Sequence, residues 1–269
     1  MEMKKKHKPQ KVSKPYLTGA MIDKTTWSGA LKIFLSTAVM ALAFMLLCVM
    51  MTWDSMLLNI VVNSVILLAA WIIFYQTGAV SGADAVNQGE IMYARREKGR
   101  PVAAWEEKLC YHPLKGLISS LIGSIPLLVC SIILAVVAQR QMTNLGTLPS
   151  WVTPFETRTE IGNALAFYHE TGAMTLEAFM RLIVRMSTMP YVNMIGATNK
   201  DAMLILERVS PLLNLIPALA YGFGYMGGVS IRANVHTNIA IGKRKAKKKQ
   251  QKERRARQQQ THRGPEQLN

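Results

Sequence analysis

The chain has 269 residues, of which 50% are hydrophobic, yet its formal net charge is +16. The charge is segregated: residues 1–32 carry +6 and residues 242–269 carry +9, which leaves only +1 for the stretch between them. A near-neutral apolar body with two basic ends is typical of a membrane protein and excludes a nucleic-acid-binding domain whose charge lies on a folded face.

Four apolar segments are long enough to cross a bilayer, since a helix rises about 1.5 Å per residue and the hydrocarbon core is about 30 Å thick. They predict spans at about 31–52, 56–75, 117–138 and 205–228. The first is longer than the apolar core of a signal peptide, about 7–15 residues, and the second follows almost at once. The predicted fold class is therefore all-α, a polytopic integral membrane protein with four transmembrane helices.

Basic residues in the connecting segments predict the orientation. The N-terminal tail 1–30, the loop 76–116 and the C-terminal tail 229–269 are rich in Lys and Arg, whereas bases and acids balance in segment 139–204. Because dense basic segments stay on the cytosolic side, both termini are expected in the cytosol and 139–204 outside. This places a membrane domain, residues 31–228, in the cell (cytoplasmic) membrane between two basic tails.

The loop after the second span has a helical pattern of its own. A helix is expected to open near Ser81 or Asp84 and to end before Gly99, and Pro101 suits the first turn of a second helix. The prediction is a short cytosolic helical hairpin.

The outer segment contains an amphipathic stretch. Glu177, Arg181 and Arg185 recur at intervals of four, and apolar side chains cover the other faces. A fifth span over 176–195 is disfavoured, because each charge at mid-bilayer costs about 2.5–3.5 kcal/mol. The expected element is an outer amphipathic helix that roofs the bundle; a ligand-gating or partner-binding role is the alternative.

The spans lack ionisable residues in their interiors, which weighs against a proton-coupled transporter. They contain amides at Asn59, Asn63 and Asn214. These amides are expected to join helices by hydrogen bonds, or alternatively to form a polar layer for a neutral solute. Small residues recur every four positions on the last span and predict close helix packing through Ala220, Gly224 and Gly228.

Catalytic signatures are not apparent. The chain has no zinc-protease, nucleophile-elbow or phosphate-loop motif, and its three cysteines show no metal-binding spacing. A membrane enzyme using His112, Cys110 or Glu90 is the least favoured alternative. We expect no enzyme activity and no cofactor or metal.

The C-terminal tail has more charge than topology requires. Ten of its bases are predicted to contact anionic lipid or RNA: Lys243, Arg244, Lys245, Lys247, Lys248, Lys249, Lys252, Arg254, Arg255 and Arg257. Without an aromatic residue for base stacking, any nucleic-acid contact would be through phosphates and not sequence-specific. The alternative is that the tail is solvated, has no partner and serves only to fix the orientation of the chain in the membrane.

These features lead to two functional hypotheses. The first is a non-catalytic multi-pass accessory or scaffold protein, with anionic lipid headgroups, RNA, the ribosome or another membrane protein as partner of its tail. The second is a subunit of a neutral-solute transporter or pore that uses the asparagine layer.

Overall fold

The structure is a computed structural model, and every regular element in the residues that it describes is helical. The described residues are 12–51, 53, 55–138, 149–155, 158, 160–165, 176–196 and 199–262. The ends of both predicted tails and most of segment 139–175 therefore lie outside the described residues.

Ten helical elements follow one another along the described chain. Their bounds are α1 (Lys24–Met50), α2 (Met56–Glu97), α3 (Ala104–Lys108), α4 (Lys115–Val137), the 3-10 helix η1 (Ser150–Phe155), α5 (Gly162–Leu165), α6 (Leu176–Ser187), α7 (Met189–Ile195), α8 (Lys200–Met226) and α9 (Gly228–His262). Four of these, α1, α2, α4 and α8, are long and apolar enough to cross a membrane. The all-α class of the described residues and the prediction of four helices long and apolar enough to span a membrane are thereby confirmed.

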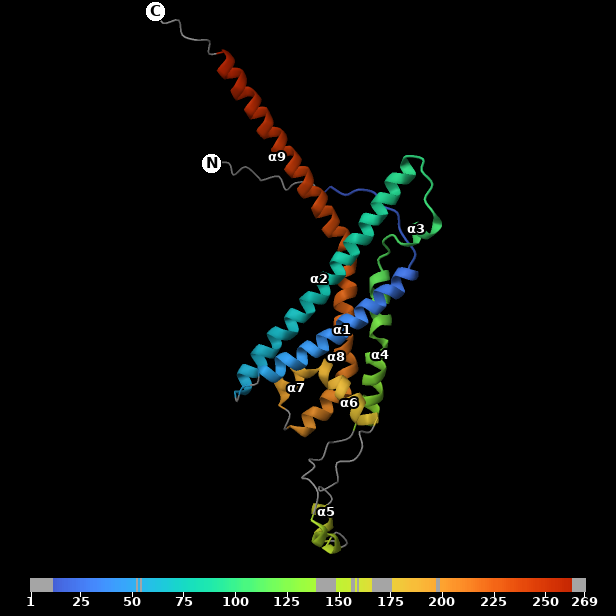
Figure 1. Ribbon diagram of the computed structural model, residues 1–269, viewed down its shortest axis with the longest axis vertical. Coiled ribbons are helices and arrows are strands. Elements are labelled where there is room, and N and C mark those ends of the chain that lie inside the picture. The colour runs from blue at the N-terminus through green and yellow to red at the C-terminus, as the bar shows by residue number, and fades with distance from the viewer. Residues whose placement is uncertain are drawn as a thin grey trace, which may run out of the picture.

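The four long helices form one bundle, shown in Figure 1. Helix α8 packs against both α4 and α2, and α1 packs on α4. The short helices α6 and α7 lie at one end of the bundle, and α3 and α9 lie at the other (Figure 1). We call the end that carries α3 and α9 the basic end, and the end that carries α6 and α7 the opposite end.

Helix α1 begins well before the predicted start at residue 31. Asp23 is its N-cap: the Asp23 carboxylate accepts a hydrogen bond from the Thr26 amide at 2.9 Å, and the Thr26 hydroxyl accepts one from the Asp23 amide. This reciprocal cap satisfies amide groups that a helix start would leave unpaired. A hydropathy pattern cannot locate this start, because the first residues of α1 are polar.

Helix α2 corrects the predicted hairpin. It runs without a break from Met56 to Glu97, so no separate helix opens near Ser81 or Asp84. The second helix of the hairpin, α3, has only 5 residues. Its ion pair between Glu106 and Arg95, at 3.3 Å, holds it against the end of α2.

Residues 176–195 form two helices instead of a fifth span. Helix α6 ends at Ser187, and α7 starts at Met189 with Pro190 in its first turn. Both pack across α1, with α6 also against α4 and α7 also against α2. They pack across the opposite end of the bundle, and their predicted location outside the membrane stays a prediction.

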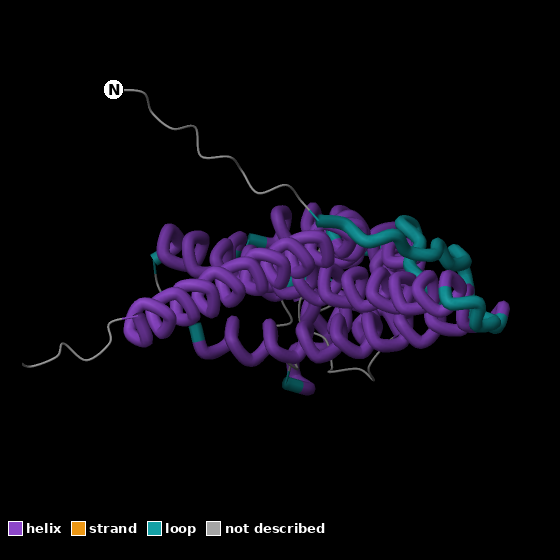
Figure 2. Tube along the Cα trace, turned by 90° about the horizontal axis from the view of Figure 1, so that it is seen from above, coloured by secondary structure: helices purple, strands orange, loops and turns teal. Residues whose placement is uncertain are grey.

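The described part of the N-terminal tail is packed and extended. The Leu17 amide donates to the Gly89 carbonyl at 3.2 Å, and the Gly19 amide donates to the Tyr111 carbonyl at 2.9 Å. This segment follows the helices as coil at the basic end (Figure 2). Residues 12–23 thus connect α2 with the loop before α4.

Candidate functional site

The basic helix α9 is anchored to α2 by a buried carboxylate. Glu90 accepts hydrogen bonds from Arg232 Nε at 3.1 Å and lies 2.7 Å from His236 Nε2. Arg232 also donates to the amide oxygen of Asn87. Glu90 is therefore a structural partner of α9, which differs from the catalytic alternative considered for it from the sequence.

Beyond this anchor, α9 leaves the bundle as a continuous helix (Figure 1). Every residue from 242 to 257 is exposed. At 100° per residue, the ten predicted contact residues from Lys243 to Arg257 are distributed over most of the helix circumference. The helix therefore has no apolar face in this part with which it could enter a bilayer interface.

The charge on this segment is dense along the axis. Residues 243–257 span about 21 Å at 1.5 Å per residue, so a cation occurs about every 2 Å. Double-stranded DNA carries one phosphate charge per about 1.7 Å. The linear density of basic residues in the exposed segment of α9 is thus similar to the density of phosphates along a nucleic-acid duplex.

The three asparagines occupy separate places. Asn59 caps the turn before α2, where it donates to the Trp53 carbonyl at 2.7 Å and accepts from the Trp53 amide at 3.0 Å. Asn63 is buried, accepts from the Cys48 thiol of α1 at 3.4 Å and donates to the Asn59 carbonyl. These contacts join α2 to its own N-terminal turn and to α1.

Asn214 is buried in α8 and joins three helices. Its amide nitrogen donates to Ser131 Oγ of α4 at 3.1 Å, and its oxygen accepts from Ser187 Oγ of α6 at 2.9 Å. Of the cavities described below, one contacts Asn214 and none contacts Asn59 or Asn63. The three amides therefore lie in helix contacts and do not line a common cavity.

The small-residue face of α8 meets a matching face on α2. A Cβ added at Gly224 of α8 would collide with the Tyr75 backbone, and one added at Gly82 of α2 would collide with the Tyr225 carbonyl. A Cβ added at Gly228, the first residue of α9, would collide with the Gly82 backbone. Ala220 is completely buried. The backbones of α2 and α8 are in direct contact here, which only glycine allows.

A buried ion-pair cluster at the opposite end was missed by the sequence analysis. Glu207 of α8 is 3% exposed and accepts from Arg181 at 2.9 Å and from Arg185 at 2.7 Å. The charged stripe of α6 thus faces α8. In the sequence, the one indication of this cluster is Glu207 itself, a carboxylate at the start of the fourth predicted span, one turn before its apolar run.

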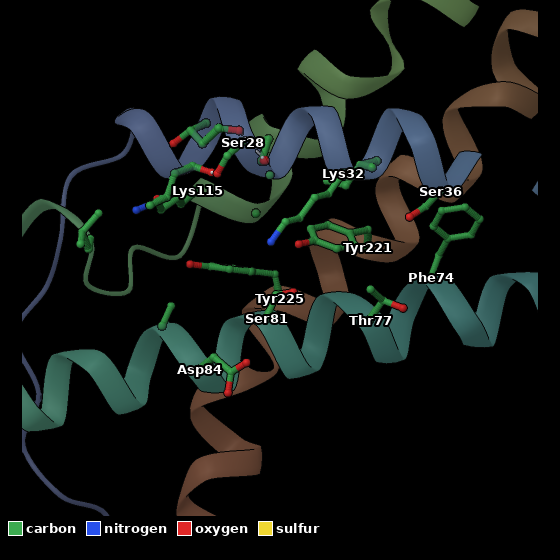
Figure 3. Close-up of a pocket in the computed structure, with 18 of the residues that line it drawn as sticks. Ser28, Lys32, Ser36, Phe74, Thr77, Ser81, Asp84, Lys115, Tyr221 and Tyr225 are labelled. Atoms are coloured by element: carbon green, nitrogen blue, oxygen red, sulfur yellow. Dashed lines mark hydrogen bonds between the residues drawn. The ribbon is translucent and has the colours of Figure 1, made fainter. Parts of the chain in front are cut away.

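A cavity of about 520 Å³ between α1 and α2 was also missed (Figure 3). Polar side chains line it on both helices, at intervals close to one or two turns. They are Ser28, Lys32 and Ser36 on α1, and Thr77, Ser81, Asp84 and Gln88 on α2. The spacing of four on α1 is visible in the sequence, but the partner stripe on α2 becomes apparent only in the fold.

The cavity is closed from behind by α8 and at one end by an ion pair. Tyr221 and Tyr225 of α8 are buried and line it, and Tyr111 stacks on Tyr225 with ring centroids 5.4 Å apart. Lys115 of α4 pairs with Asp23 at 2.9 Å. Within the described chain, Lys32 and Asp84 make no hydrogen bond or ion pair, so they are the free charges of this cavity.

Cys110 and His112 do not form an activated pair. The Cys110 thiol is fully buried and donates weakly to the Glu106 carbonyl at 3.6 Å, while His112 Nδ1 accepts from the Leu114 amide. Burial, with the nearby Glu107 carboxylate, raises the pKa of Cys110. A raised pKa disfavours the reactive thiolate.

Comparisons of this chain with protein-family models, with curated proteins and with solved structures find no match. Its function must therefore be inferred from its own geometry.

Proposed function

We propose that this chain is a multi-pass protein of the cytoplasmic membrane, with both termini in the cytosol, that holds a basic helix as a scaffold for RNA. The observation that carries the proposal is the exposed segment of α9, residues 242–257, which leaves the bundle with a cation about every 2 Å. In this proposal the protein is an accessory component without catalytic activity of its own.

The charge distribution supports the orientation. The basic end of the bundle carries the N-terminal segment, the end of α2 with its arginines, and α9, whereas the opposite end carries the balanced charges of α6 and α8. Lys and Arg near span ends remain on the cytosolic side. Assigning the basic end to the cytosol satisfies this rule at every described connection.

The direction of α9 favours a soluble polyanion over the membrane surface. Gly228 directly follows the fourth candidate span, and Lys243 lies about 22 Å further along the helix at 1.5 Å per residue. Electrostatic attraction to a charged surface decays over about 8–10 Å at physiological salt. The cations of α9 from Lys243 onward therefore lie further along the helix from the end of the candidate span than this decay length.

The composition of this segment favours contact through phosphates. Residues 242–257 contain no aromatic side chain on which a base could stack. The cations surround the helix and are not aligned on one groove-reading face. The expected interaction is thus independent of sequence and dependent on salt.

The alternative, a neutral-solute pore lined by an asparagine layer, has less support. Asn63 and Asn214 use their amides in contacts between helices, and Asn59 braces a turn. No described cavity contacts all three. We therefore retain the scaffold as the proposed function.

The test is RNA binding by the purified protein in mild detergent. The variant K243Q/R244Q/K247Q/K248Q/R254Q/R255Q removes six charges but keeps helix-forming residues, and Q250A/Q251A is the matched control on the same exposed segment. We expect the six-fold variant to bind single-stranded RNA at least tenfold more weakly, while the control binds like the wild type. The logarithm of wild-type affinity should fall with the logarithm of salt concentration, by about 0.7 for each phosphate contacted.

Vesicle flotation separates RNA from lipid as the partner. If anionic vesicles compete with RNA for the wild type at physiological salt, the membrane surface is the partner and the RNA proposal is wrong. Equal RNA binding by the wild type and the variant with six substitutions would show that the segment does not bind RNA and serves only to fix the topology.

A further inference from the structure

The cavity between α1 and α2 changes from polar to apolar along its length. At the basic end it is lined by Thr25 and Ser28 of α1 and by Gln88 of α2. At its other end it is lined by Met40 of α1 and Phe74 of α2. A ligand that fills this cavity must therefore be amphiphilic, with its polar part at the basic end.

The apolar end leads into a second, smaller crevice. This crevice of about 60 Å³ shares Met40 and Phe74 with the first cavity and continues past Phe44, Ala70 and Leu213. The larger, polar space is thus joined to a small and mostly apolar crevice that α1 and α2 line together with α8 and the short helices α6 and α7. A headgroup in the polar space would thus be followed by the first carbons of an acyl chain at the crevice.

The cavity opens sideways between α1 and α2. Toward the basic end the two helices pack on different neighbours, α1 on α4 and α2 on α8 and α9, whereas α7 contacts both at the opposite end. Lining residues Lys32 and Asp84 are exposed, which shows that the cavity is open. The outer faces of the same helices are apolar and exposed, with Leu35 at 53% and Val80 at 59%. In a bilayer, lipid would have direct access to the opening.

The two free charges specify the headgroup. In Figure 3, Lys32 lies nearer to Ser36 and Phe74 than Asp84 does, and Asp84 lies about one turn nearer to the basic end than Ser81. A cation deeper in the cavity suits a phosphate next to the glycerol, and a carboxylate nearer its polar end suits an ammonium further from the chains. Hydroxyl groups of serine and threonine between the charges can donate to phosphate oxygens.

The geometry points to a binding site for a zwitterionic phospholipid with a primary ammonium headgroup, of the phosphatidylethanolamine type, held between α1 and α2. The phosphate contacts Lys32, the ammonium contacts Asp84, and the first acyl chain follows Met40 and Phe74. Lys115 takes no part, because Asp23 neutralises it. This inference rests on the membrane placement proposed above, but not on RNA binding by α9.

The test uses the full-length protein, delipidated in detergent, with phosphatidylethanolamine, phosphatidylcholine or phosphatidylglycerol added back. Bound lipid is measured by native mass spectrometry, and thermal stability is measured in parallel. We expect phosphatidylethanolamine to bind most tightly. Phosphatidylcholine lacks the N–H donors for Asp84, and phosphatidylglycerol lacks the positive charge.

Each substitution of a charged lining residue is compared with a control substitution of a like-charged residue on the same helix. K32Q is compared with K24Q, and D84N with E97Q; Lys24 and Glu97 are exposed and do not line the cavity. We expect K32Q to weaken phosphatidylethanolamine binding about tenfold, the loss of one charge-assisted hydrogen bond. D84N should abolish the preference for phosphatidylethanolamine over phosphatidylcholine, whereas both controls should bind like the wild type.

A steric pair tests the location independently of charge. S36W fills the cavity, and V39W places the same ring on a face that is 65% exposed and outside it. Only S36W should prevent photocrosslinking of a lipid carrying a diazirine in its acyl chain to Met40 or Phe74. The inference would be overturned if the lipid crosslinked elsewhere in the wild type, or if neither K32Q nor D84N changed binding. It would also be overturned if phosphatidylglycerol bound more tightly than phosphatidylethanolamine, or if free phosphoethanolamine competed fully. None of these results depends on the charges of α9, so the RNA proposal is tested separately.

Discussion

Buried charges in the described chain are paired, and each pairing joins elements that are distant in sequence. Asp23 and Lys115 connect the start of α1 with the start of α4, and Glu90 connects α2 with α9. Glu207 connects α8 with α6. Because an unpaired buried charge is strongly destabilising, these contacts fix how the helices dock at the two ends of the bundle.

Glu207 is the most informative residue to change. E207Q would leave Arg181 and Arg185 without their shared carboxylate, and we expect it to lower the unfolding free energy by about 3 kcal/mol. E177Q is the matched control: Glu177 also pairs with Arg181, but its side chain is 39% exposed. An exposed pair contributes at most about 1 kcal/mol. Thermal unfolding in detergent distinguishes the two, and similar losses would contradict the importance assigned to burial.

Asp23 makes stability depend on pH. Burial alone would raise its pKa, but hydrogen bonds from Thr25, Lys115 and the Thr26 amide, with the Lys115 charge, bring the pKa below 3.8. A carboxyl group whose pKa is lower in the folded state stabilises the fold above its unfolded pKa and loses this effect as pH falls.

The expected result concerns D23N, which keeps a good N-cap but removes the charge. Its melting temperature should be lower than that of the wild type at pH 7, and the difference should shrink as the pH falls below 3.8. E97Q, at an exposed position on α2, should show no such difference. A D23N deficit that is the same at pH 7 and pH 3 would show that the charge of Asp23 does not contribute.

At the scale of the elements, the central contact is the direct approach of α2 and α8. Gly82 on α2 and Gly224 on α8 each face the backbone of the other helix. Glycine weakens an isolated helix by about 1 kcal/mol relative to alanine, yet α2 continues for 42 residues through this region. The packing that these glycines permit outweighs their low helix propensity.

Alanine substitutions of glycine should therefore have opposite effects at two sites. G224A places a methyl group against the Tyr75 backbone and should destabilise the protein by about 1–3 kcal/mol, as overpacking does. G242A lies on α9, where a Cβ meets open space, and should be neutral or increase helicity. Thermal unfolding and circular dichroism measure both effects. A G224A protein as stable as the wild type would show that the backbones can separate without cost.

The elements also show what sequence could predict. The apolar runs locate the four long helices because crossing a bilayer depends on composition along one segment. The length of α2 was missed because Gly78 and Gly82 resemble a loop until α8 is placed beside them. The cavity was missed because Lys32 and Asp84 lie on different helices, and their relation depends on how α1 and α2 diverge.

At the scale of the whole molecule, the two ends of the bundle differ. The opposite end is closed by α6 and α7, whose charges are paired within the fold. The basic end holds the N-terminal segment in place and extends α9 beyond the bundle (Figure 1). RNA contact by α9 requires that this end faces the cytosol and the opposite end faces outward, whereas lipid binding between α1 and α2 requires only that both helices lie in the bilayer.

The most direct test of this arrangement is cysteine labelling from outside the cell. Single cysteines are introduced by W151C, K98C and Q251C after the three native cysteines are replaced by alanine. A membrane-impermeant maleimide should label W151C, in η1, in intact cells, and should label K98C and Q251C only after the membrane is permeabilised. Labelling of K98C or Q251C in intact cells, with protection of W151C, would contradict the proposed membrane placement and with it the proposed RNA contact by α9.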